Sequence, residues 1–382
     1  MKQAREPFSA GRLWAVILKD LIQLRRDRLT FAMMIGIPII QMALFGFAIN
    51  GDPRHLPTAV VAQEQGPYTR SLVQALEHTG YFRVTHAGIG EREADRLLSR
   101  GEVQFVLTVP AGFARAVDRG ERPALLLEAD ATDPAATGNA LGAVQQLAAG
   151  ALRHDLRHLP AAAPSTQAVP FEWRIHRRYN PEGITQNNVV PGLMGVILTM
   201  TMVMMTSLGL TREVERGTME NLLATPVQPL EVMVGKIVPF VAIGLVQVAV
   251  ILLAARHVFG VPFNGSTVLL MLGTLAFIGA SLMVGITISS VARSQMQAMQ
   301  MTFFFFLPSM LLSGFMFPFR GMPGWAQWLG EALPLTHFLR LVRGLMLKGN
   351  AAADVWPHLW PLLLFTAAML AVGLLRFRRT LD

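Results

Sequence analysis

Six long stretches of the chain contain no Asp, Glu, Lys or Arg, and they limit the possible folds more than any other feature. Each is about as long as the roughly 20 residues that a helix needs to cross about 30 Å of hydrocarbon. Only 15% of all residues are charged, against roughly 25% in an ordinary soluble domain. We therefore predict a polytopic α-helical membrane protein with six transmembrane helices. The stretches are Leu29–Ile49, Val189–Thr211, Ile237–Ala255, Gly265–Ala292, Met299–Phe319 and Trp356–Leu375.

The distribution of basic residues predicts how these helices are oriented. The net charge of +8 includes seven Lys and Arg between Lys2 and Arg28 and three more at Arg376, Arg378 and Arg379. Cytoplasmic segments of membrane proteins are enriched in Lys and Arg. We therefore expect both termini in the cytoplasm, which agrees with an even number of helices. Membrane topology thus accounts for the basic charge without a nucleic-acid partner.

One segment departs from this charge rule. Residues 320–355 should be extracytoplasmic, yet they carry Arg320, Arg340, Arg343 and Lys348. The apolar residues of the segment recur at helical spacing, which indicates amphipathic helices rather than a plain loop.

The remaining parts of the membrane region follow from length and patterning. Residues 1–28 place their apolar residues on one helical face, which is typical of a cytoplasmic amphipathic helix that lies in the membrane interface or packs on a soluble partner. Residues 29–49 form a first transmembrane helix that is too long for a cleaved signal peptide. Residues 189–382 hold the other five helices and a polar loop at 212–236.

Residues 50–188 have a different composition, with 14 Arg against 15 Asp and Glu, and are long enough to bury a core of their own. Short β-rich runs such as Thr58–Ala62 and Val103–Val109 alternate with helical runs such as Tyr68–His78 and Arg92–Arg100. This alternation predicts a small extracytoplasmic α/β domain.

The sequence has no motif for catalysis, and we predict no catalytic, cofactor-binding or metal-binding residue. It contains no cysteine, no H-E-x-x-H and no G-x-S-x-G. Gly235-Lys236 lacks the flanking residues of a phosphate-binding loop, so any ATP-driven process needs another polypeptide to hydrolyse ATP. The predicted spans hold no carboxylate, which disfavours an ion-coupled carrier. Asp130 and Asp133 precede a predicted helix and are interpreted as capping residues.

The loop at 212–236 is short and dense in charge. Thr218 can cap a short helix that Pro226 ends, which leaves Leu222 and Leu223 exposed at the membrane edge. Such an element suits a mechanical contact with a cytoplasmic partner. A plain charged turn between two helices has the same spacing and remains the alternative.

The residues from Glu213 to Glu220 read E-V-E-R-G-T-M-E. This run resembles the E-x-E-x-G-T-x-E core of permease subunits of type 2 ABC exporters, the group that includes bacterial multidrug-efflux permeases. The resemblance covers the whole chain. Three further places agree with it: Arg177–Glu182 with Val190-Pro191-Gly192, Leu312-Ser313-Gly314 with Phe317-Pro318, and Leu333–Thr336 with Arg343-Gly344 and Lys348-Gly349.

The resemblance implies a subunit of an ATP-driven exporter in the bacterial inner membrane, with a lipophilic or drug-like substrate. It also implies a dimer with a second copy or a paralogue, and two separate nucleotide-binding ATPase subunits that hold ATP and Mg. Domain 50–188 then faces the periplasm, where an adaptor protein is a further partner, and segment 320–355 is re-entrant. The alternative is a non-transporting membrane sensor or scaffold whose periplasmic domain binds a ligand.

The resemblance also assigns roles to residues. Segment 1–28 becomes a connecting helix beside the coupling loop 212–236, which seats on the ATPase. The residues assigned to coupling are Glu213, Glu215, Arg216, Gly217, Thr218, Glu220, Leu222 and Leu223. Met299, Phe303, Phe306 and Met310 are candidates for the translocation path, and contact of these side chains with lipid is the alternative.

Overall fold

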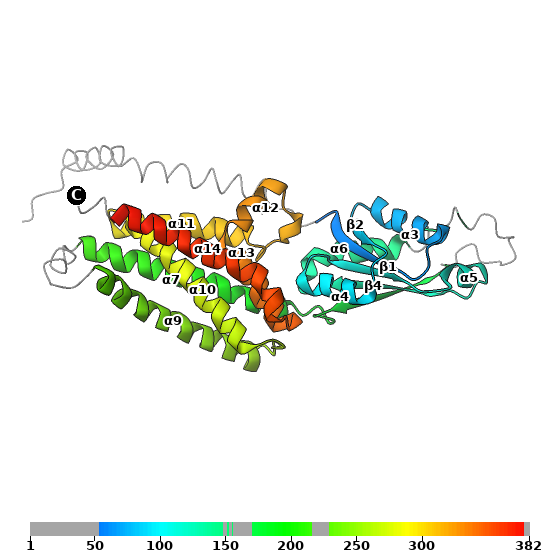
Figure 1. Ribbon diagram of the computed structural model, residues 1–382, viewed down its shortest axis with the longest axis horizontal. Helices are drawn as coiled ribbons and strands as arrows, with labels where there is room; N and C mark the ends of the chain where they lie inside the picture. The colour runs from blue at the N-terminus through cyan, green and yellow to red at the C-terminus, as the bar shows by residue number, and fades with distance from the viewer. Residues whose placement is uncertain (1–52, 148–150, 153–154, 156–169, 216–228, 378–382) are drawn as a thin grey trace, which may run out of the picture.

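The computed structural model of the chain describes residues 53–147, 151–152, 155, 170–215 and 229–377. An α/β part and a helical bundle lie end to end along the longest axis (Figure 1). The predicted first transmembrane helix at 29–49 lies outside the described residues.

The α/β part is built on a five-stranded sheet with the order β2-β1-β3-β4-β5. Only β3 and β4 pair antiparallel, and the other neighbours are parallel. The strands are β1 (Leu56–Ala62), β2 (Phe82–Ala87), β3 (Phe105–Val109), β4 (Ala124–Asp130) and β5 (Glu172–Arg178), and the helices are α3 (Pro67–His78), α4 (Glu91–Arg100), α5 (Phe113–Asp118) and α6 (Pro134–Leu147). The predicted α/β architecture is therefore present.

Helices cover the two faces of the sheet unequally. On one face, α3, α5 and α6 close a core that includes Leu72, Phe105 and Val144. On the other face α4 alone packs over β1 and β3, with Leu98 against Val106. The β4–β5 half of that face carries charged side chains instead of a covering helix. Strand β5 was not predicted, because only Trp173 and Ile175 of its seven residues are apolar.

Four helices among the described residues are long and apolar enough to cross a membrane. They belong to α7 (Thr185–Glu215), α9 (Pro229–His257), α10 (Thr267–Ser289) and α14 (Ala352–Phe377). In α7 and α10, 61% and 67% of the apolar window is buried, against 17% in α9 and 11% in α14. We infer that α7 and α10 form the centre of the bundle, while α9 and α14 present apolar faces to lipid.

The predicted span Met299–Phe319 differs from the helix found there. Helix α11 runs from Gln295 to Leu312, so it begins earlier and ends earlier than predicted. It ends there because Gly314 has φ +83°, a conformation that turns the chain away from the helix axis. The glutamines in its first turns also lower its hydropathy. A count of six transmembrane helices thus stays a prediction, whereas the described residues show a helical bundle with four candidate spans.

Segment 320–355 contains a series of short helices, as its spacing predicted. They are η3 (Phe319–Gly321), α12 (Gly324–Glu331), α13 (Pro334–Arg343) and the π-helix η4 (Gly344–Lys348). Helix α13 packs into the bundle core through Leu335, Phe338 and Val342, and Phe338 stacks on Phe277 of α10 with ring centroids 4.1 Å apart. The segment is therefore part of the bundle core.

A close backbone approach joins α10 to η4. Asn264 donates from its backbone N–H to the Met346 carbonyl and from its side chain to the Leu347 carbonyl, both at 3.0 Å. A Cβ on Gly265 would lie 2.5 Å from the Leu345 carbonyl oxygen, so only glycine allows this approach. The turn before α10 thus satisfies the last carbonyls of the short helix.

We expect Gly265→Ala to destabilise the chain by about 1–3 kcal/mol, because the new methyl group meets backbone that cannot move aside. Thermal unfolding of the detergent-purified protein measures the effect. Gly279→Ala in α10 is the matched control, since its Cβ would meet Thr366 at an ordinary 3.8 Å. Equal melting temperatures for the two variants would contradict the close approach.

Candidate functional site

The predicted coupling residues lie only partly within the described chain. Glu213 and Glu215 belong to the last turn of α7, where Glu215 is exposed and Glu213 is half-buried. The other assigned residues fall outside the described residues, and their coupling role stays a prediction. They are Arg216, Gly217, Thr218, Glu220, Leu222 and Leu223.

Glu215 binds the first residue of α11. One carboxylate oxygen accepts the backbone N–H of Gln295 at 2.8 Å, and the other accepts the Gln295 side-chain amide at 2.6 Å. Ser294 caps the same helix by accepting from the N–H of Gln297 at 3.2 Å. The first N–H groups of a helix lack intrahelical partners and carry partial positive charge. The Glu215 carboxylate at the end of α7 therefore supplies a hydrogen-bond acceptor and a negative charge to the start of α11.

The two helices are joined again further along. The hydroxyls of Ser207 in α7 and Thr302 in α11 are 3.0 Å apart, and both residues are buried. Buried hydroxyls in an apolar environment are costly unless they are bonded. This contact holds α7 and α11 in one register.

The candidate path residues face two directions from α11. Met299 and Phe303 are 43% and 38% exposed and form an apolar face of the helix. Phe306 and Met310 instead pack against the core of the bundle. The structure therefore separates the four residues, and their role in a translocation path stays a prediction.

The basic residues of segment 320–355 all have partners. Arg320 donates to the carbonyls of Gly101 and Glu102 at the end of α4. Arg343 donates to the Gly314 carbonyl at 3.1 Å. Arg340 forms two hydrogen bonds with Glu331, at 3.0 and 2.7 Å, and its guanidinium lies 4.5 Å from the centroid of the Phe319 ring.

Lys348 makes a buried ion pair. Its ammonium lies 2.6 Å from Asp130 of β4, and only 8% and 7% of the two side chains are exposed. It also donates to the Leu98 carbonyl at 3.3 Å and lies 5.2 Å from the centroid of the Tyr179 ring. Asp130 in turn accepts from the backbone and hydroxyl of Thr132. Asp130 therefore has a partner that its interpretation as a capping residue did not include, because its second oxygen binds Lys348.

These contacts fasten the α/β part to the bundle. Lys348 and Arg320 both approach the C-terminal end of α4, where backbone carbonyls carry partial negative charge. Arg100 adds a third link to Asp354 at the start of α14, at 2.8 Å. Three cations and two carboxylates thus join the two parts.

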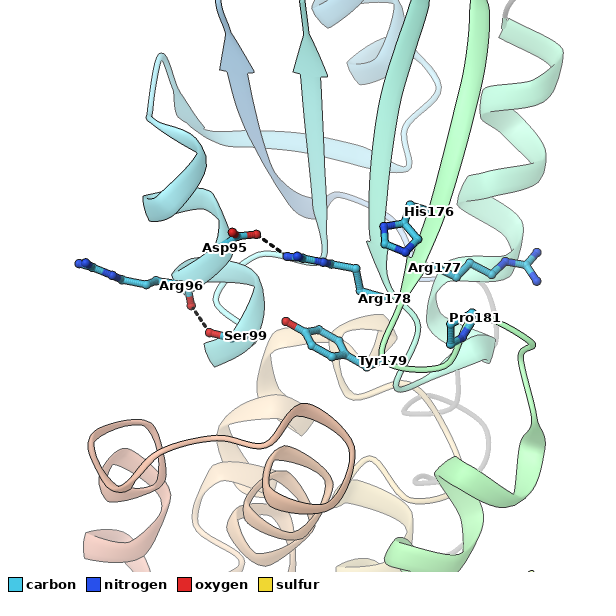
Figure 2. A pocket seen from close by; sticks show the side chains of 8 residues that line it. All are labelled: Asp95, Arg96, Ser99, His176, Arg177, Arg178, Tyr179 and Pro181. Atoms are coloured by element: carbon cyan, nitrogen blue, oxygen red, sulfur yellow. Dashed lines mark hydrogen bonds and ion pairs between the residues drawn. The ribbon is translucent and has the colours of Figure 1, made fainter. Parts of the chain in front are cut away.

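A pocket of about 410 Å³ opens beside this junction, between α4 and β5. Figure 2 shows Asp95 and Arg178 facing each other across it, whereas Arg177 points away. Arg178 also lies 3.3 Å from Glu128, so its charge is balanced within the chain. Burial and the nearby Asp130 raise the pKa of Tyr179 to about 12, so its phenol stays protonated. The charged and polar side chains that line the pocket can make polar contacts with a ligand.

The surroundings lower the pKa of two ionisable groups, Glu331 on α12 and His337 on α13. Burial disfavours the charged form of Glu331, but the hydrogen bonds and charge of Arg340 outweigh it and lower the pKa of Glu331. Burial lowers the pKa of His337, whose ring bonds the Glu331 carbonyl at 2.8 Å. A neutral histidine beside an ionised Glu331–Arg340 pair is consistent with a structural contact.

Removal of the Lys348 charge should destabilise the junction. We expect Lys348→Met to cost about 3–5 kcal/mol, because Asp130 is left buried without its counter-charge. Adding Asp130→Asn should restore part of that loss. Denaturant unfolding followed by tryptophan fluorescence measures both.

Arg119→Met is the control for the junction variant, because Arg119 pairs with Glu121 at 3.6 Å with 69% of its side chain exposed. Such a pair contributes about 0–1 kcal/mol. A Lys348 variant as stable as this control would show that the buried pair does not hold the junction.

The contacts of the junction residues were not predicted, although the sequence carries one signal of them. Four cations on the expected outer side broke the charge rule for membrane loops. Such cations need counter-charges or carbonyls when they are buried. Asp130, at the end of a strand and far away in sequence, gave no sign of pairing with Lys348.

Comparison with known proteins identifies the family. Residues 28–375 match the family described as ABC-2 family transporter protein, and the chain belongs to it. It is 30% identical over 371 residues to the probable multidrug ABC transporter permease YbhR of Escherichia coli, which covers 96% of this chain and 98% of the relative. It is 29% identical over 394 residues to the inner membrane transport permease YhhJ of Escherichia coli, covering 100% and 99%. No solved structure matches the chain.

The resemblance to multidrug ABC permeases is therefore confirmed. The chain is the permease subunit of an ABC transporter, and ATP hydrolysis takes place in a separate subunit. A more distant relative, ABC transporter G family member 20 of Dictyostelium discoideum, is 27% identical over 377 residues, which are 94% of this chain and 50% of the relative.

Proposed function

We propose that this chain is the membrane-spanning subunit of an ATP-driven exporter in the bacterial inner membrane. It works as a dimer with a second copy or a paralogue, bound to two ATPase subunits. Its substrate is lipophilic or drug-like and leaves from the cytoplasm or the inner leaflet. The names of two relatives, the probable multidrug permease YbhR and the inner membrane transport permease YhhJ, support a drug-like substrate and the inner membrane.

The observation that carries this proposal is the path of α7. This helix begins at Thr185, directly after the α/β part, and ends at Glu215, which with Glu213 is one of the predicted coupling residues. It packs against α10, α11 and α13, so it lies in the middle of the bundle. A single continuous helix thus connects the predicted ATPase contact to the centre of the membrane part.

Exposed apolar surface supports the dimer and the path. Met299 and Phe303 of α11 and Leu193, Ile197 and Met205 of α7 are large apolar residues with exposed side chains. A second permease subunit, a lipophilic substrate or lipid could cover such a surface. We propose that the α11 face meets the substrate.

The α/β part acts as a platform on the periplasmic side. Lys348, Arg320 and Arg100 tie it to the short helices and to α14. We propose that it moves together with these helices during transport. Its pocket and the charged β4–β5 face are then available to an adaptor protein.

Co-purification tests the proposed function. When a tagged form of the chain is purified from detergent-solubilised membranes, an ATPase subunit should co-purify with it. The complex should hydrolyse ATP, and the chain without that subunit should not. Gly217→Val and Glu220→Lys should abolish stimulated hydrolysis, since both lie in the predicted coupling loop and outside every predicted span.

Glu121→Lys is the charge-matched control for Glu220→Lys, because Glu121 is exposed in the α/β part. It should leave ATP hydrolysis unchanged. Normal activity of both loop variants would contradict the coupling role. A chain that brings no ATPase would favour the sensor or scaffold instead.

Topology is tested separately. A reporter that works only in the periplasm should be active when it is fused at Gly120. A reporter that works only in the cytoplasm should be active when it is fused after Asp382. The expectation rests on the basic ends of the chain. A cytoplasmic signal at Gly120 would contradict the periplasmic platform.

A further inference from the structure

We propose that Glu215 is a positioning residue that passes movement from the end of α7 to the start of α11. The inference deepens the proposed function and rests on it. Glu215 is the last described residue before segment 216–228, which contains most of the predicted ATPase contact. Its carboxylate is bonded to Gln295, so it acts within the chain.

The geometry of the contact makes it a suitable mechanical link. Both Glu215 oxygens bind one residue, at 2.8 Å to the backbone and 2.6 Å to the side chain of Gln295. Two bonds to one residue fix direction as well as distance, and charge-assisted bonds are stronger than neutral ones. The backbone bond acts directly on the main chain of α11.

Charge favours the same contact. Gln295 is the first residue of α11, and its N–H has no acceptor within the helix. A negative charge at this position is stabilised by the helix dipole. A displacement of α7 that carried Glu215 away would leave that N–H without its acceptor, so α11 is drawn along with it.

The link ends at the residues proposed to meet the substrate. Met299 and Phe303 lie one and two turns beyond Gln295 on the same helix. The buried Ser207–Thr302 contact keeps the next part of α11 against α7. Movement of α7 therefore reaches the exposed apolar face of α11 along bonded elements.

Gln295→Pro separates this role from helix stability. Proline at the first helical position removes the N–H and the side-chain amide yet favours helix formation. Ser294 before it is extended, with φ −147° and ψ 156°, which is the conformation that proline prefers in its predecessor. The Ser294 cap of Gln297 remains. Gln295→Ala is the matched control, because it keeps the backbone N–H.

Spin labels can follow the two helices separately, because the chain has no cysteine of its own. One protein carries a label at Arg212→Cys on α7 and another at Met299→Cys on α11. Each is studied as the complex with its co-purified ATPase, before and after addition of MgATP. We expect both labels to respond with otherwise native residues and with Gln295→Ala. With Gln295→Pro, only the Arg212 label should respond.

Substitutions of Glu215 provide the second test. Glu215→Ala should abolish the response at Met299, and Glu215→Gln should restore it, because an amide oxygen still accepts the Gln295 N–H. Responses at both labels in Gln295→Pro would overturn the link and leave the proposed function intact. Loss of both responses would also overturn it, because Gln295 would then affect α7 itself. No response to MgATP in the otherwise native complex would contradict the proposed function.

Discussion

The buried ion pair between Lys348 and Asp130 is the interaction on which the arrangement of this protein depends. Both charges are removed from water, and each is compensated by the other and by neighbouring polar groups. A buried pair of this kind need not add net stability, but breaking it leaves an unpaired charge. It therefore specifies one way for the α/β part to sit on the bundle. The other cations at the junction reinforce the same placement.

The contacts at the two ends of the bundle differ in burial, and this difference determines which end moves more easily. Helix α13 and η4 pack in the bundle core beside α7 and α10, so the half of the bundle next to the α/β part is held both by charge and by apolar contact. At the opposite end, α7 and α11 meet through the exposed Glu215 and the half-buried Gln295. Elements held by exposed contacts move at lower free energy than elements held by buried ones. An input at the end of α7, where we propose that the ATPase binds, is thus expected to move the helices there before it disturbs the junction.

The pattern of apolar and polar residues predicted most of the helices and strands but not the contacts between the α/β part and the bundle. Apolar runs long enough to span a membrane predicted α7, α9, α10 and α14, and alternating short runs predicted the strands from β1 to β4. Strand β5 escaped because Arg174, His176 and Arg178 sit on an uncovered half of the sheet, where burial imposes no apolar pattern. The Lys348–Asp130 and Glu215–Gln295 contacts depend on tertiary placement, and a single sequence does not encode partners so far apart in any local pattern.

We propose that the junction between the α/β part and the bundle stays fixed while the helix ends near Glu215 and Gln295 move. Pulsed electron paramagnetic resonance between labels at Glu93→Cys on α4 and Trp328→Cys on α12 tests it directly, because both positions are exposed and flank the junction. In the complex with its ATPase, the account predicts a single narrow distance distribution that is the same with and without MgATP. A distribution that shifts or broadens when MgATP is added would contradict it.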